Sequence, residues 1–258
     1  MEQTEDYRYL DSNLAHIREE LDRACREAGR SPAEVTLLAA IKSADVGQIN
    51  YLHRVLGVCD VGENRVQQLL ARYDQLDREG LRIHFIGTLQ SNKVKYIIDK
   101  VDMIQSLDSL GLAREIEKQC VRHDRDMDVL IEINAGHEES KSGVAPEEAG
   151  ALAAAVCGGD FPHLHLQGFM TMAPRSDEDT YRHIFANVRT LCRRIWEDTL
   201  GRDSPMVLSM GMSESYVPAA AEGATLVRVG RGLFARPEGT GAPSPACVPS
   251  LDGDTKHP

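Results

Sequence analysis

Short apolar runs alternate with segments of helical periodicity along this chain, and that alternation constrains the fold more than any other feature. Eight such runs occur, at residues 35–41, 57–61, 83–86, 101–104, 129–133, 164–169, 206–208 and 226–229. Apolar residues at three- and four-residue steps between the runs are typical of amphipathic helices. Strands that alternate with helices form parallel sheets through right-handed crossovers. Eight strands in 258 residues therefore favour an α/β fold of the closed (β/α)8 TIM-barrel type over an open doubly wound sheet.

The two ends of the chain differ from this alternating middle. Apolar residues at helical spacing predict an amphipathic N-terminal helix before the first strand, at Leu14, Ile17, Leu21, Ala24 and Ala28. Asp11 or Ser12 would cap this helix, and Gly29 would end it. From Pro237 onward, glycines, prolines and polar residues predict a disordered C-terminal tail. We therefore expect one barrel domain over residues 1–236 and a tail over residues 237–258.

Composition excludes several classes of function. The formal net charge of −11 disfavours nucleic acid and anionic membranes as partners. No apolar stretch is long enough to cross a bilayer, and the acidic segment 1–9 does not resemble a secretory or transit peptide. The six cysteines are scattered without a C-x-x-C pair, which argues against a zinc ribbon or a disulfide framework. We expect a cytoplasmic protein with reduced thiols and, without coiled-coil heptads, a monomer.

Lys42 stands directly after the first apolar run, where a strand covered on both faces would end. Functional residues of a (β/α)8 barrel lie at the carboxyl ends of its strands, so this amine would face a pocket. A partly desolvated amine near other cations has a lowered pKa and can condense with an aldehyde to an imine. Taken alone, Lys42 is more simply a solvated lysine at the start of a loop, because lysine is rarely buried. Only further residues that converge on the same place can favour the chemical interpretation.

The segments after the last two runs supply such a convergence. Small residues over 209–213 would let backbone amides and the Ser213 hydroxyl approach an anion. The segment 228–232 adds Arg228, Gly230 and Arg231, and loops after strands seven and eight are the usual phosphate site of this architecture. A phosphorylated aldehyde fits both features, and pyridoxal 5'-phosphate (PLP) is the most familiar one that proteins hold through lysine. An inward-pointing Arg228 would keep the pyridine nitrogen unprotonated, which makes the ring a weak electron sink.

Ordered motifs along the chain resemble those of a known family. They are residues 37–42, 61–64, 84–87, 89–93, 139–143, 168–171, 208–213, 222–225 and 227–230, in this order. On these motifs the chain resembles the pyridoxal phosphate homeostasis proteins, relatives of the barrel domain of bacterial alanine racemases. The resemblance spans residues 12 to 236 approximately, and so many ordered motifs are implausible by chance.

The resemblance implies a set of cofactor-binding residues: Lys42, Asn64, Ser213, Arg228, Gly230 and Arg231. Lys42 matches the lysine that holds PLP as an internal aldimine, and Arg228 matches the residue at the pyridine nitrogen. Asn64 lies in the motif that lines the cofactor pocket, and the other three match the phosphate-binding elements. The implied function is PLP binding in intracellular vitamin B6 homeostasis without established turnover, with apo forms of PLP enzymes as conceivable partners.

Four positions depart from the family pattern: Ala44, Arg65, Thr88 and Arg231. Family members commonly have lysine, tyrosine, histidine and threonine there. The chain thus lacks a second lysine beside Lys42 and a hydroxyl at position 231, where the arginine could supply charge to a phosphate instead. None of the four changes removes Lys42 itself.

Three other functions compete with this interpretation. A PLP-dependent amino-acid racemase or related enzyme ranks second, because its two-base chemistry needs an opposing group that relatives take from a second domain. A lysine-dependent aldolase acting on a sugar phosphate ranks third, since no acid/base partner is identifiable. A metal-dependent hydrolase would rest on His163 and His165, and such a pair without further ligands is more often structural. His84 is expected to be a packed core histidine.

Overall fold

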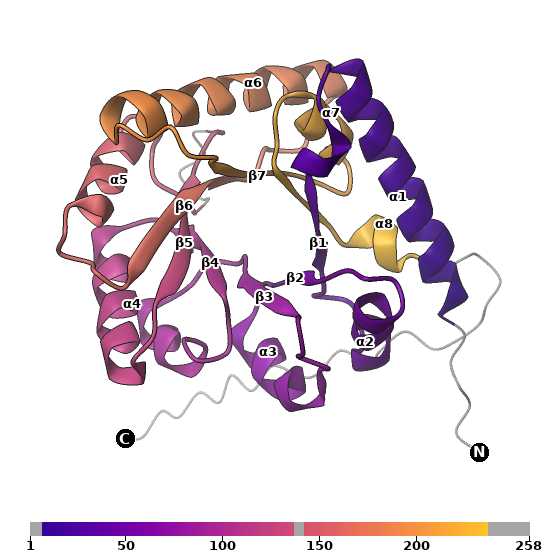
Figure 1. Ribbon diagram of the computed structural model, residues 1–258, viewed down its shortest axis with the longest axis horizontal. Helices are drawn as coiled ribbons and strands as arrows, with labels where there is room; N and C mark the ends of the chain where they lie inside the picture. Colours follow the sequence, from indigo (N-terminus) through magenta and orange to yellow (C-terminus); the bar gives the residue numbers. More distant parts are fainter. Residues whose placement is uncertain (1–6, 137–141, 237–258) are drawn as a thin grey trace, which may run out of the picture.

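Eight parallel strands close into a barrel in the computed structural model, which describes residues 7–136 and 142–236. The strands are β1 (Thr36–Ala40), β2 (Asp60–Glu63), β3 (Arg82–Phe85), β4 (Met103–Leu107), β5 (Met127–Ile133), β6 (Leu164–Thr171), β7 (Val207–Met212) and β8 (Leu226–Val229). β1 pairs with β2 on one side and with β8 on the other, which closes the ring seen in Figure 1. The (β/α)8 barrel expected from the sequence is confirmed, and each apolar run contributes a strand.

Helices surround the strands on the outside of the ring (Figure 1). They are α1 (Arg8–Glu27), α2 (Val46–Arg54), α3 (Val66–Arg72), α4 (Leu110–His123), α5 (Ala149–Cys157), α6 (Glu178–Arg194), α7 (Tyr216–Ala221) and α8 (Arg231–Phe234). Three 3₁₀ turns, η1 (Pro32–Glu34), η2 (Tyr73–Gln75) and η3 (Ser91–Tyr96), and a π-helical turn, η4 (Ile195–Thr199), complete the regular structure. Between β3 and β4 the connection carries η3 in place of an α-helix.

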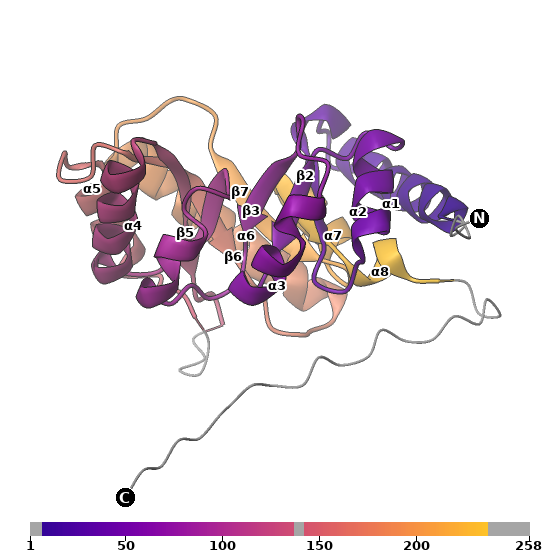
Figure 2. The same cartoon turned by 90° about the horizontal axis from the view of Figure 1, so that it is seen from below.

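The N-terminal helix α1 lies along the outside of the barrel, where it contacts α7 and α8 (Figures 1 and 2). It begins at Arg8, so the predicted caps Asp11 and Ser12 are wrong. The helix extends further because Leu10, one turn earlier than the predicted start, is fully buried and adds to the apolar face. Gly29, with φ +69°, follows the last turn as expected.

The second strand is shifted along the chain relative to its apolar run. Residues 57–61 were expected to form it, whereas β2 covers Asp60–Glu63. Gly57 has φ +69°, a left-handed conformation that belongs to a turn, and Val58 is buried before the strand starts. The shift places Glu63 at the carboxyl end of the strand, fully buried, which matters for the site described below.

The interior of the barrel is only partly apolar. Alternate side chains of each strand point inward, and Leu38, Ala40, Ile86 and Leu226 form one small apolar cluster there. Met103, Leu130 and Met170 form another. Buried polar side chains share the interior with them: His84, Gln105, Glu132, Ser209 and Arg228. Since a buried polar group is costly unless hydrogen-bonded, the partners of these five residues are informative.

Parts of the expected organisation fall outside the described residues. These parts are the proposed tail over 237–258 and residues 139–141 of the motif 139–143. Within the described ranges, no helix combines the length and the hydropathy needed to span a membrane.

Candidate functional site

One cavity at the carboxyl ends of the strands is lined by all six residues that the sequence singled out. They are Lys42, Asn64, Ser213, Arg228, Gly230 and Arg231, and the cavity has a volume of about 240 Å³. Ala40, Ile86, Met172 and Met212 form apolar parts of its wall. The lining comes from the ends of β1, β2, β3, β6, β7 and β8, so residues far apart in the sequence converge on it. We refer to this space as the carboxyl-end cavity.

Lys42 lies in the turn two residues beyond the end of β1, and its side chain contributes to the carboxyl-end cavity. Lys42 is exposed, so the expectation that its amine is partly desolvated is wrong. The physical reason is its position past the last ladder residue, on the open side of the barrel, where the preceding Ile41 takes the buried place.

A buried ion pair holds the turn that carries Lys42. Arg72, on α3, donates to the backbone carbonyls of Ile41 at 3.0 Å and Ala44 at 3.1 Å. Its guanidinium also pairs with the Glu63 carboxylate, which accepts from the backbone N–H groups of Asn64 at 2.7 Å and of residue 65 at 3.0 Å. The turns after β1 and β2 are therefore tied together by one carboxylate and one guanidinium. Sequence reasoning missed this role, although Glu63 next to Asn64 at the end of an apolar run was a usable signal.

One hydrogen bond joins the turns after β7 and β8. The backbone N–H of Gly230 donates to Ser213 Oγ at 3.2 Å. A Cβ at Gly230 would come within 2.8 Å of the Ala40 carbonyl oxygen, so only glycine lets β8 and β1 approach this closely. Gly211, with φ +90°, turns the end of β7 toward this place. The Gly230 N–H and the Ser213 hydroxyl, bonded to each other, therefore lie on the side of the cavity formed by β7 and β8.

Two arginines and one carboxylate stand at the rim of the cavity. Arg175 and Arg231 both donate to Glu214 Oε1. Burial tends to raise the pKa of Glu214, but the hydrogen bonds from Arg231 and Arg175 outweigh it and lower that pKa below its ordinary value. Glu214 therefore remains ionised and holds the two exposed guanidinium groups over the opening. Arg175 and Glu214 were not predicted from the sequence.

Arg228, on β8, is buried at the inner end of the cavity. Its Nη1 donates to Ser209 Oγ at 2.6 Å, and its Nη2 donates to the Thr171 carbonyl oxygen at 2.8 Å. Burial lowers the pKa of Arg228 to about 10, and the nearby Glu132 partly opposes this shift. The guanidinium stays charged at neutral pH, and its orientation is fixed on two sides. Ser209 was expected in a loop near the anion; it lies within β7, because the strand runs on to Met212.

Glu132, on β5, is a buried carboxyl that the sequence interpretation did not use. Burial, and then Asp108, raise its pKa to about 7, while Arg228 acts in the opposite direction. Its Oε2 atom is buried without a hydrogen-bond partner among the described residues. A glutamate inside the apolar run 129–133 was the available signal for it.

The residues present fit an anionic ligand that also carries a carbonyl group. Asn64 Oδ1 is a buried polar atom without a partner within the described part of the chain, and Asn64 lines the cavity. The cations Lys42, Arg228 and Arg231 share this space with the Ser213 hydroxyl. Such a set of donors around a partly apolar wall is typical of a pre-formed small-molecule site. Arg65 and Thr88 instead line a neighbouring hollow of about 220 Å³, and Ala44 meets Arg72 through its carbonyl.

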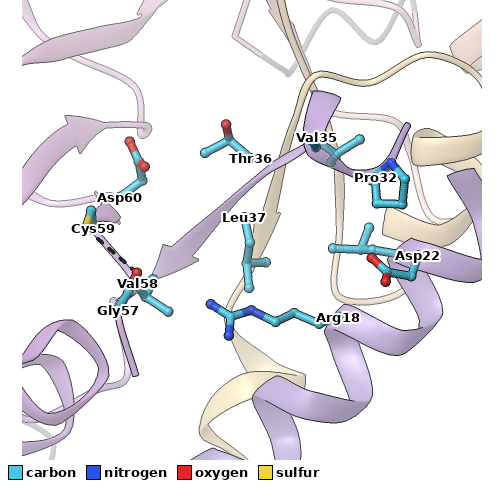
Figure 3. Close-up of a pocket in the computed structure, with 12 residues that line it drawn as sticks. Arg18, Asp22, Pro32, Val35, Thr36, Leu37, Gly57, Val58, Cys59 and Asp60 are labelled. Carbon is cyan, nitrogen blue, oxygen red and sulfur yellow. Dashed lines mark hydrogen bonds between the residues drawn. The ribbon is translucent and has the colours of Figure 1, made fainter. Parts of the chain in front are cut away.

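A larger hollow lies at the opposite end of the strands (Figure 3). It measures about 460 Å³ and is lined by Arg18, Leu21, Asp22, Pro32, Ala33, Val35, Thr36, Leu37, Gly57, Val58, Cys59 and Asp60. Figure 3 shows Arg18 and Asp22 extending from α1, and the Cys59 thiol donating to the Gly57 carbonyl. We refer to it as the amino-end hollow. Its lining comes from α1, η1 and the starts of β1 and β2 only.

Comparison with known proteins connects these features to a family. The model of the alanine racemase N-terminal domain matches residues 12–237. The pyridoxal phosphate homeostasis protein of Aquifex aeolicus (strain VF5) is 40% identical over 226 residues, covering 86% of this chain and 95% of that protein.

Two solved structures share the fold of this chain. A protein of unknown function from Bifidobacterium adolescentis is 34% identical with a TM-score of 0.79, covering 88% of this chain and 95% of that one. PipY of Synechococcus elongatus PCC7942, solved with PLP bound, is 28% identical with a TM-score of 0.74, covering 88% of this chain and 100% of that one.

Proposed function

This chain belongs to the alanine racemase N-terminal domain family and, within it, to the pyridoxal phosphate homeostasis proteins, and on that premise we propose that it binds PLP in the carboxyl-end cavity. The observation that carries the proposal is that Lys42 lines the same small cavity as Arg228 and the turn at Gly230. These residues come from opposite ends of the sequence. An amine, a buried guanidinium and the turn at Gly230 with the Ser213 hydroxyl would match the aldehyde, ring nitrogen and phosphate of one ligand.

Lys42 would attach the cofactor covalently. Its amine would supply the nitrogen of an imine with the aldehyde, and one water molecule would be released. Exposure of Lys42 lets the amine exchange protons and reach an incoming aldehyde, and the Arg72–Glu63 pair keeps its turn in one position. Such a linkage is reversible in water, which suits a protein that takes up and releases the cofactor.

Ser213, Gly230 and Arg231 would hold the phosphate, and Asn64 would line the ring. The backbone amides and hydroxyl between β7 and β8 supply uncharged donors, and Arg231 can exchange its partner Glu214 for the phosphate. Arg228 would donate to the ring nitrogen, which then stays unprotonated because guanidinium retains its proton. PLP supplies an electron sink for amino-acid chemistry, and an unprotonated ring weakens that sink.

The proposed role is therefore to bind PLP for vitamin B6 homeostasis in the cytoplasm, as a monomer without robust turnover. Two-base chemistry on an amino acid needs proton acceptors on both faces of the substrate. Lys42 supplies one such group at the cavity, while the rim on the far side carries the Arg175–Glu214–Arg231 cluster, whose carboxylate is engaged by both cations. Apo forms of PLP enzymes would be the recipients of the released cofactor.

Titration of apo-protein with PLP tests this function. We expect a visible absorption band from the linkage in wild-type protein and in Lys93→Arg, and none in Lys42→Arg. Lys93 is a suitable control because it lines the neighbouring hollow and not the carboxyl-end cavity. A band of equal strength in Lys42→Arg would contradict the proposal. Racemisation of amino acids by the wild type, lost in Lys42→Arg, would instead establish the alternative enzymatic function.

A further inference from the structure

A continuous chain of hydrogen bonds crosses the barrel interior and ends on Arg228. Asp60 Oδ1 lies 3.0 Å from His84 Nε2, and His84 Nδ1 lies 2.9 Å from Gln105 Nε2. Gln105 Oε1 accepts from Ser209 Oγ at 2.7 Å, and Ser209 Oγ accepts from Arg228 Nη1 at 2.6 Å. These five residues, which we call the polar chain, come from β2, β3, β4, β7 and β8. All five are buried.

The donors of the polar chain all point in one direction. Arg228 can only donate, so the Ser209 hydroxyl proton is directed to the Gln105 carbonyl oxygen. The Gln105 amide then donates to His84 Nδ1, which must carry no proton. His84 donates through Nε2 to Asp60, whose other oxygen accepts from Arg82 at 2.6 Å. One carboxylate at the amino end of the barrel thus fixes the tautomer of His84 and the rotation of every group up to Arg228.

We propose that His84 and Gln105 are positioning residues for Arg228, and that they set the direction of its hydrogen bonds in the cofactor site from the opposite end of the barrel. The inference rests on the proposed function, because the guanidinium would face the PLP ring. Two of the five N–H groups of Arg228 are used by Ser209 and Thr171. The hydrogen bonds to Ser209 and Thr171 fix the plane of the guanidinium. The directions of its other three N–H groups are therefore set before any cofactor binds.

Because the polar chain is buried, reversing its donors and acceptors would be costly. Reversing the Gln105 amide would bring its oxygen to His84 Nδ1, which would then need a proton in addition to the one that Asp60 accepts from Nε2. His84 would then be a cation, and the barrel interior would hold two buried positive charges, those of His84 and Arg228. Asp60 also lines the amino-end hollow, where Figure 3 shows its side chain extending away from the Cys59 thiol. The far end of the chain is therefore near solvent, although Asp60 itself is only 5% exposed.

The first test is made on apo-protein by nitrogen-15 NMR of the histidine side chains. We expect His84 in wild-type protein to be protonated on Nε2 and unprotonated on Nδ1. In Gln105→Glu, the new carboxylate accepts from Nδ1, so His84 should carry both protons. A wild-type His84 protonated on Nδ1 would overturn the inference whatever the protein does with PLP. Because this measurement needs no cofactor, it separates the polar chain from the proposed function.

The second test measures PLP binding and the absorption maximum of the bound cofactor. Gln105→Leu leaves Ser209 without its acceptor, and we expect a shifted maximum and a dissociation constant raised about fivefold, as for one lost hydrogen bond. Gln105→Glu keeps an acceptor for Ser209 and should restore affinity to within about twofold of wild type. His53→Gln is the control, because His53 is also buried but contacts the carbonyls of Val58 and Glu79 outside the polar chain.

Each outcome decides between the two proposals. Wild-type binding with an unchanged spectrum and affinity in Gln105→Leu would overturn the inference alone. Equal shifts in Gln105→Leu and in His53→Gln would show a general packing effect, and would also overturn it. A wild-type protein that binds no PLP would overturn the proposed function and, with it, the role of the polar chain. If Gln105→Leu does not fold, the wild-type tautomer and Gln105→Glu still decide.

Discussion

The two ends of the barrel differ in what converges on them. The amino-end hollow is the larger, at about 460 Å³ against about 240 Å³, but its walls come from one sector of the fold, α1 with the starts of β1 and β2. The carboxyl-end cavity collects side chains from six strand ends, among them Lys42, Arg228 and Arg231. Volume alone therefore does not favour the carboxyl end. The convergence of cations and hydrogen-bond donors from separate strands distinguishes the carboxyl-end cavity from the amino-end hollow.

The difference has a cause in the architecture. Parallel strands all present their carboxyl ends, with the following turns, on the same side, so small changes in eight turns can assemble one site. At the amino end, the hollow lies between α1, η1 and the starts of β1 and β2, and the other strands do not contribute to it (Figure 3). The polar chain links the two ends through the interior, so residues at the amino end affect the orientation of Arg228 in the carboxyl-end cavity.

The largest effect is expected where a buried charge holds the turn of Lys42. Arg72→Met leaves the Glu63 carboxylate, which is fully buried, without its cation. We expect the free energy of unfolding to fall by about 3–5 kcal/mol, as for other broken buried ion pairs. Arg18→Met, at the amino-end hollow, is the control; Arg18 is exposed, so its loss should change stability by about 0.5 kcal/mol or less. Urea unfolding measures the stability of both variants. An equal loss of stability in Arg72→Met and Arg18→Met would contradict a special role for the buried pair at the carboxyl end.

A second effect depends on pH and comes from Glu132. Its pKa is raised from 4.5 to about 7, so the folded protein loses stability as pH rises through this range, because the unfolded chain ionises first. The loss reaches about 3 kcal/mol above pH 7. Glu132→Gln removes this titration, so the stability of the variant relative to wild type should increase by that amount between acid and alkaline pH. A difference independent of pH would show that Glu132 ionises normally.

A third, smaller effect tests the close approach of β8 to β1. Gly230→Ala places a Cβ against the Ala40 carbonyl, so we expect a loss of about 1–3 kcal/mol in stability together with weaker PLP binding. Gly232→Ala is the matched control two residues later, because a Cβ there meets nothing within 4 Å. Thermal unfolding and PLP titration should separate the pair. Wild-type stability and PLP affinity in Gly230→Ala would mean that neither depends on the close approach of β8 to β1.

The smallest effect concerns the rim of the cavity. Glu214→Gln releases Arg175 and Arg231 from a shared carboxylate, so inorganic phosphate should bind more tightly. Exposed ion pairs contribute little because water screens them, so we expect a gain of only a fewfold in the dissociation constant. Calorimetry with phosphate measures it, and Glu178→Gln serves as a control, since Glu178 pairs with Arg182 elsewhere on the surface. Weaker phosphate binding in Glu214→Gln would assign Glu214 a supporting role instead.

Much of this arrangement was predictable, for definite reasons. Strand ends in a barrel converge by topology, so Lys42 and the segments at Ser213 and Gly230 could be assigned to one end from the order of the runs, and the family resemblance added Asn64. What the sequence did not predict depends on side-chain direction and register. Ser209 was expected in a loop and lies inside β7, where it meets Arg228. Arg72 and Gln105 act through partners distant in sequence, and no local pattern reveals such pairs.

The exposure of Lys42 marks another limit of sequence reasoning. An apolar run that ends in lysine predicts a partly buried amine, but the strand ends at Ala40 and the turn carries Lys42 outward. β1 thus ends one residue earlier than its apolar run, and such a small difference in a strand boundary decides whether a side chain is buried. β2 ends two residues later than its run, and this opposite shift buries Glu63, which the run 57–61 had placed beyond the strand.

The most direct test of the account is to locate the bound cofactor on the chain. Apo-protein is mixed with PLP, reduced with borohydride to fix the linkage, and digested for peptide mass spectrometry. The account predicts that the modified residue is Lys42. Modification confined to other lysines, or no stable modification at a saturating concentration of PLP, would contradict it.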